Sequence, residues 1–77
     1  MKVKHQTEIF RQEFPKRLIS VMKERDMSQK QLAVTLGVKE GAVSKYVAGD
    51  RLPRVPTLVL MSRILDVDLE WLACVNE

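Results

Sequence analysis

The sequence has little of several residue types that other classes of protein need. Its single cysteine, Cys74, excludes an intramolecular disulfide framework, which fits a reducing cytosol. The longest strongly apolar run, from Leu58 to Met61, is too short to span a bilayer. Lys2 and Lys4 are followed by polar residues, which is unlike a secretory signal peptide. We therefore expect a soluble cytoplasmic protein.

Glycine and proline are also scarce, with three of each in 77 residues. No stretch alternates apolar and polar positions with β-branched residues, so strands are not expected. A chain of this length forms at most one domain. The sequence shows no catalytic carboxylate pair, nucleophile–base pair, phosphate-binding loop or metal-ligand spacing. We therefore expect no enzyme activity, no cofactor and no metal.

The charge is unevenly distributed along the chain, although the net charge is only +3. Residues 1–27 hold seven Lys and Arg against four Asp and Glu, and residues 28–54 hold five against two. Residues 55–77 hold one against four. The basic residues 1–54 and the acidic residues 55–77 suggest that one face of the protein binds a polyanion and that another face makes a different contact. Ordinary solvated charge is the alternative.

The first expected helix follows a polar segment. Four apolar residues recur at the spacing of one helical face: Phe14, Leu18, Val21 and Met22. Pro15 fits a first helical turn, where its missing N–H costs nothing. The pattern predicts a helix over residues 15–26, within a domain over 14–77. Residues 1–13 are predicted as a mostly polar N-terminal arm, in which Thr7 could cap a short helical turn.

The second expected helix has signals at both ends. Ser28 and Gln31 have the spacing of a capping box, in which each side chain bonds the other residue's backbone N–H. The apolar stripe that follows consists of Leu32, Ala33 and Leu36. Gly37 ends the helix, because the left-handed conformation at a helix end suits glycine. These signals predict a helix over 29–36.

The third expected helix follows after a short turn. Its apolar stripe consists of Ala42, Val43, Tyr46 and Val47. Gly49 ends this helix, which is predicted over 40–48, and Tyr46 is expected in the core. Lys39 stands where an N-capping Ser, Thr or Asp is usual, which forgoes roughly 1 kcal/mol. Two short helices joined by a turn containing glycine are typical of a helix-turn-helix, whose second helix fits the major groove of DNA.

Two more helices complete the expected fold. Pro56 lies in the first turn of one, which ends near Asp66. Its core-facing residues are Leu58, Met61 and Leu65. Asp66 tolerates the left-handed backbone that the following turn requires, and Asp68 is a good N-cap for the last helix. That helix carries Leu69, Leu72 and Val75. The sequence therefore predicts an all-α fold of five helices.

A set of residues spread over positions 14–72 keeps the spacing of a known family. They are Ser28, Gln29, Leu32, Ala33, Leu36, Gly37, Val38, Val43, Ser44, Lys45, Tyr46, Gly49, Pro53, Leu58, Leu65, Val67, Asp68, Leu69, Glu70, Trp71 and Leu72. In these residues the chain resembles the lambda-repressor-like, or Xre-type, helix-turn-helix domain. The resemblance implies a five-helix DNA-binding domain whose recognition helix spans 40–48.

The resemblance also implies which residues contact DNA. Gln29 would reach a phosphate together with backbone N–H groups at the start of its helix, with Lys30 beside it. The exposed face of the recognition helix would contact bases through Lys39, Glu40, Gly41, Ser44 and Lys45. Arg51 and Arg54, in the loop that follows, would contact the DNA backbone.

The side-chain chemistry of these residues fits such roles independently of the family resemblance. Lys45 can donate to guanine O6 and N7, and Glu40 can accept from cytosine N4. Ser44 is ambiguous, and Gly41 reads no base but permits close approach. Solvated surface charge is the alternative for each charged residue.

The sequence has more apolar residues near its C-terminal end than the core of a minimal domain would bury. Leu60 and Ile64 lie on a second face of their helix, and Trp71 and Val75 add apolar surface near the C-terminus. Exposed patches of this kind usually mark an interface, so we expect these four residues in a homodimer interface. Scattered single exposures, or cover by apolar residues of the arm, are the alternatives.

The leading hypothesis is a small homodimeric transcriptional regulator at the bacterial nucleoid. It would bind a palindromic operator in double-stranded DNA, as a repressor of phage, prophage or restriction–modification-controller type. A DNA-binding antitoxin of a toxin–antitoxin pair and a protein-interaction module on the same fold stay open. No small-molecule ligand and no membrane contact are expected.

Overall fold

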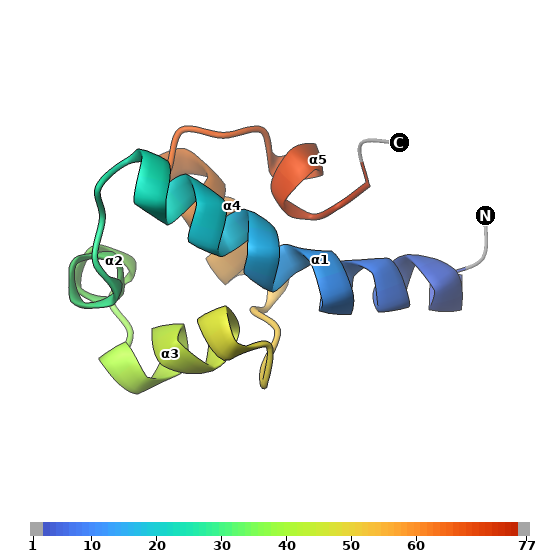
Figure 1. Ribbon diagram of the computed structural model, residues 1–77, viewed down its shortest axis with the longest axis horizontal. Coiled ribbons are helices and arrows are strands. Elements are labelled where there is room, and N and C mark those ends of the chain that lie inside the picture. The colour runs from blue at the N-terminus through green and yellow to red at the C-terminus, as the bar shows by residue number, and fades with distance from the viewer. Residues whose placement is uncertain (1–2, 76–77) are drawn as a thin grey trace.

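The computed structural model describes residues 3–75 and contains five α-helices over this range (Figure 1). They are α1 (Val3–Glu24), α2 (Gln29–Leu36), α3 (Glu40–Ala48), α4 (Val55–Ile64) and α5 (Leu69–Leu72). These residues form no strand, so the prediction of an all-α, five-helix fold is confirmed. Among the helices described, none combines the length and apolar character needed to span a bilayer.

The first helix is much longer than predicted. α1 begins at Val3 and includes Pro15, so the prediction of an arm before a helix at residue 15 is wrong for residues 3–13. Residues 1 and 2 of that arm lie outside the described residues. Residues 3–13 are rich in Lys, Gln, Glu and Arg, which form helices readily without an apolar stripe. Ile9 and Phe10 pack against the core.

Most of the core comes from residues that the apolar stripes predicted, but Cys74 is buried without having been predicted, and Val75 is exposed. The buried apolar residues are Phe14, Leu18, Val21, Met22, Leu32, Ala33, Val43, Tyr46, Leu58, Met61, Leu65, Leu72 and Cys74. The ring of Phe10, which packs against this core, lies 5.1 Å from the ring of Phe14 between centroids. Both α3 and α5 contact α1, and they lie on opposite sides of it in Figure 1.

The helix-turn-helix begins and ends where its sequence signals predicted. Ser28 Oγ accepts from the Gln31 N–H at 3.1 Å, and Gln31 Oε1 accepts from the Ser28 N–H at 2.8 Å, which forms the capping box. Gly37 ends α2 with φ of 75°, and Gly49 ends α3 with φ of 81°. Both glycines therefore have the left-handed conformation that their positions require.

The C-terminal region confirms two predictions and corrects one. Asp66 has the expected left-handed backbone, with φ of 55°. Asp68 occupies the predicted N-cap position of α5, although its side chain makes no capping hydrogen bond. Val75 lies beyond α5 rather than on it, because the helix ends at Leu72 and Cys74 adopts a φ of 62°.

One arginine joins α1 to the end of α4. Arg25 Nε donates to the Leu65 carbonyl at 2.9 Å, and its Nη2 donates to the Asp66 carbonyl at 3.1 Å. The last carbonyls of a helix have no partner within the helix, and a cation there also opposes the negative end of the helix dipole. The contact holds the turn between α4 and α5 against α1.

Candidate nucleic-acid interface

The outer face of α3 is open to solvent. Its inner stripe, Val43 and Tyr46, is buried in the core. The residues predicted to contact bases are all exposed: Lys39, Glu40, Gly41, Ser44 and Lys45. α3 packs mainly against α2 and more lightly against α1, so its outer face projects from the body of the domain. This is the presentation that a helix needs to enter the major groove.

A groove of about 620 Å³ lies between the start of α3 and the start of α4. It is lined by Val38, Lys39, Gly41, Ala42, Lys45, Tyr46, Arg51, Arg54 and Thr57. Four of these residues are cationic, and none of the described residues that line it is acidic. We call it the basic groove. It brings together five residues predicted to contact DNA, and its positive charge favours a polyanion.

Of the other predicted residues, Gln29 and Ser44 meet at the start of α2. Gln29 is the first residue of α2, and its side-chain Oε1 accepts a hydrogen bond from Ser44 Oγ of α3 at 2.6 Å. Lys30 follows and is exposed. Neither these residues nor Glu40 line the basic groove. On a helix, residues four apart lie one above the other, so Gly41 and Lys45 form one row and Glu40 and Ser44 the neighbouring row.

The start of α2 retains backbone donors. The first N–H groups of a helix have no partner within it. The capping box satisfies the Gln31 N–H, and the N–H groups of Gln29 and Lys30 remain for an anion. A helix N-terminus with free N–H groups and a nearby lysine is suited to a phosphate.

The start of α3 differs, because its N-cap residue provides no cap. Lys39 has an extended backbone, with φ of −74° and ψ of 148°, and its side chain makes no capping hydrogen bond. The sequence expectation that Lys39 forgoes capping is therefore confirmed. Its ammonium group is free to point into the basic groove that it lines.

Four residues of the basic groove were not predicted as part of the site: Val38, Ala42, Tyr46 and Thr57. Tyr46 was expected in the core and is only 4% exposed, yet it also lines the groove. Thr57 lies in the first turn of α4, close in sequence to the N-cap residue Arg54, which makes no side-chain cap bond. The position of Thr57 at a helix start beside an arginine was a usable signal.

The four predicted dimer residues differ in their exposure. Leu60 and Val75 are each 48% exposed, whereas Ile64 and Trp71 are half-buried. Trp71 is held by Arg17, whose Nη1 donates to the Trp71 carbonyl at 2.5 Å and whose guanidinium carbon lies 5.4 Å from the ring centroid. Trp71 is therefore less available to a partner than its sequence position implied.

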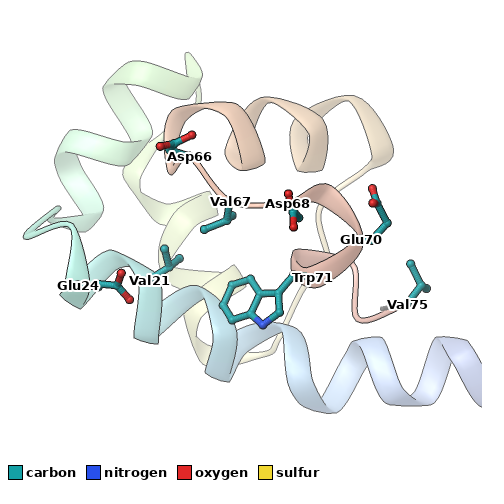
Figure 2. Close-up of a pocket in the computed structure, with 8 residues that line it drawn as sticks. All are labelled: Val21, Glu24, Asp66, Val67, Asp68, Glu70, Trp71 and Val75. Atoms are coloured by element: carbon teal, nitrogen blue, oxygen red, sulfur yellow. The ribbon is translucent and has the colours of Figure 1, made fainter. Parts of the chain in front are cut away.

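Trp71 and Val75 line a surface hollow of about 780 Å³, in which the Trp71 ring lies between α5 and α1 (Figure 2). The other lining residues are Val21, Glu24, Asp66, Val67, Asp68 and Glu70. We call it the acidic hollow, because four of its residues are acidic. Leu60 and Ile64 do not line it.

Comparison with known proteins agrees with this geometry. Residues 18–72, more than half of the chain, match the model of a helix-turn-helix family. The chain is 36% identical over 59 residues to a Bacillus subtilis (strain 168) protein described as the uncharacterized HTH-type transcriptional regulator YqaE. The match covers 77% of this chain and only 51% of that protein, so the chain spans about half of its relative. Solved structures give no significant match. The chain belongs to the lambda-repressor-like, Xre-type helix-turn-helix family of DNA-binding domains.

Proposed function

We propose that this chain is a homodimeric transcription regulator that represses by binding a palindromic operator at the bacterial nucleoid. The observation that carries the proposal is the basic groove, in which four cations gather beside the exposed face of α3. The name of the Bacillus subtilis relative supports transcription regulation. A repressor needs only to occupy its operator, which a domain of this kind can do without further machinery.

In this proposal residues of α3 discriminate between bases, and the loop after α3 contacts the DNA backbone. Lys45 and Glu40 discriminate between bases, because an ammonium and a carboxylate favour different groups in the major groove. Arg51, Arg54 and Thr57 hold the DNA backbone at the start of α4. Contacts to phosphate position the protein without reading sequence.

Dimerisation follows from the small size of the reading surface. One α3 offers three or four side chains to base edges, too few for useful specificity on a genome. Two copies would read half-sites about one helical turn, ~34 Å, apart. We propose Leu60 and Ile64 of α4, and Trp71 and Val75 near α5, as candidate interface residues. Leu60 and Ile64 do not line the acidic hollow, so substitutions in each pair test its part in the interface separately.

The test is selection of bound DNA from a random duplex pool by the purified chain. We expect a palindromic consensus whose half-sites are about one helical turn apart. Sedimentation with and without the selected duplex should show two protein chains per site. An enriched site that is short and asymmetric, bound by one chain, would contradict the homodimer. No enrichment and no duplex binding would contradict the function itself.

A further inference from the structure

The hydrogen bond between Ser44 and Gln29 joins the two helices of the helix-turn-helix through their side chains. Ser44 Oγ on α3 donates to Gln29 Oε1 at the start of α2, across 2.6 Å. Both residues were expected to touch DNA separately, Gln29 at a phosphate and Ser44 at a base. We propose that Ser44 is a positioning residue, which holds Gln29 on a phosphate and does not itself discriminate between bases. This inference rests on the proposed DNA binding.

The chemistry of the hydroxyl group limits what Ser44 can read. A serine hydroxyl has one proton to donate, and here that proton goes to Gln29 Oε1. Guanine O6 and N7, adenine N7 and thymine O4 are all acceptors in the major groove. Ser44 cannot donate to any of them while it is bonded to Gln29. Its proton therefore selects no base, and the contact that remains is an accepted bond from adenine N6 or cytosine N4.

The same bond directs the other end of the Gln29 amide. Because Oε1 is held by Ser44, the free polar group of this side chain is Nε2, with two N–H donors. The backbone N–H groups of Gln29 and Lys30 lie at the same helix start, beyond the capping box of Ser28 and Gln31. A DNA phosphate placed there would accept from several donors at once. Fixing the Gln29 rotamer before binding reduces the entropy lost on association.

A double-mutant cycle on the full chain tests the coupling. The variants are Ser44→Ala, Gln29→Ala and the double variant, each measured on the selected operator. We expect Ser44→Ala to raise Kd by about 2- to 10-fold per half-site, the range of one neutral hydrogen bond. In the Gln29→Ala background the same change should have almost no effect. Ser44→Thr keeps the hydroxyl and should restore most of the affinity.

The second readout is sequence preference, which separates positioning from base reading. Selection with Ser44→Ala should return the wild-type consensus, since every sequence loses the same contact. A changed preference at one base pair, with no coupling to Gln29, would overturn the proposal. Equal Kd values for wild type and Ser44→Ala would also overturn it. If the wild type binds no duplex at all, DNA binding itself fails, which circular dichroism of the intact fold distinguishes from unfolding.

A third readout locates the phosphate. Duplexes in which single phosphates are replaced by neutral methylphosphonates identify the phosphates that the wild type needs. One of these should lose its importance in both Gln29→Ala and Ser44→Ala, and remain important in Ser44→Thr. If Ser44→Ala leaves the methylphosphonate profile unchanged while Gln29→Ala alters it, then Ser44 does not position Gln29.

Discussion

The basic groove and the acidic hollow are similar in size and opposite in charge. The groove beside α3 has four cationic lining residues, whereas the hollow between α1 and α5 has four acidic ones: Glu24, Asp66, Asp68 and Glu70. They belong to helices on opposite sides of α1 (Figure 1). A net charge of +3 conceals this separation. The local field decides where a polyanion approaches, so only the groove side favours DNA.

The charge of the acidic hollow also affects a dimer formed through α5. In a two-fold symmetric interface the same surface meets itself, so Trp71 and Val75 would bring two acidic hollows together. Like charges brought close oppose association and are screened by salt. Salt should therefore act in opposite directions on the two surfaces.

The largest expected effect is the loss of DNA affinity with salt. If a dimer neutralises six to ten phosphates, its affinity should fall about 10³–10⁵-fold between 50 and 200 mM salt. Fluorescence anisotropy of a labelled operator over a salt series measures the slope. A random duplex serves as the control and should show a similar slope at weaker affinity. A flat response would remove the basic groove as a polyanion site.

The next effect concerns the interface. A carboxylate placed in it by Val75→Asp or Leu60→Asp should weaken the dimer by about 100-fold or more, because an unpaired buried charge costs more than roughly 3 kcal/mol. Only the variant at the true interface should yield a folded monomer in sedimentation. If Val75→Asp is the effective one, the wild-type dimer should tighten as salt rises. A wild type that is monomeric at high concentration and binds without cooperativity would contradict both interfaces.

A smaller effect on DNA affinity distinguishes residues of the basic groove that discriminate between bases from residues that contact the DNA backbone. Lys45→Ala should cost about 1–3 kcal/mol on the preferred operator and relax preference at one base pair per half-site. Arg51→Ala should weaken all sequences about equally and reduce the salt slope by about one. Selection from a random pool with each variant compares the two profiles. Identical profiles would show that this division of roles is wrong.

The helix-turn-helix was predictable because its ends are marked by local chemistry. The capping box at Ser28 and the glycines at positions 37 and 49 fix both helices within a few residues of the signal. The first half of α1 was not predictable in this way. Its residues are good helix formers without an apolar stripe, and Pro15 reads as a helix start although α1 passes through it.

The candidate site was predictable in part for a similar reason. Lys45 and Arg51 follow from the position of α3 and of the loop after it, since their exposure depends on local spacing. Thr57 enters the basic groove only because α4 folds back beside α3. The bond from Ser44 to Gln29 also depends on how two helices cross, which no spacing along the chain encodes. The contact of Trp71 with Arg17 spans 54 residues and was missed for the same reason.

The smallest expected effect is at Lys39, where stability and DNA binding are opposed. Serine suits the extended N-cap backbone of this residue, so Lys39→Ser should supply the capping bond that α3 lacks and stabilise the fold by about 0.5–2 kcal/mol. The melting temperature of a domain this small should then rise by roughly 4–8 °C per kcal/mol. The variant also removes one cation from the basic groove, so its DNA affinity should fall and its salt slope should shrink by about one.

The matched control for this variant is Lys39→Ala, which removes the same charge and adds no cap. Both variants should lose DNA affinity equally, and only Lys39→Ser should gain stability in thermal unfolding followed by circular dichroism. Equal stability of the two would mean that a serine does not cap α3 here. Unchanged DNA affinity in both would mean that Lys39 is a solvated charge, and that the basic groove attracts DNA through Lys45, Arg51 and Arg54 alone.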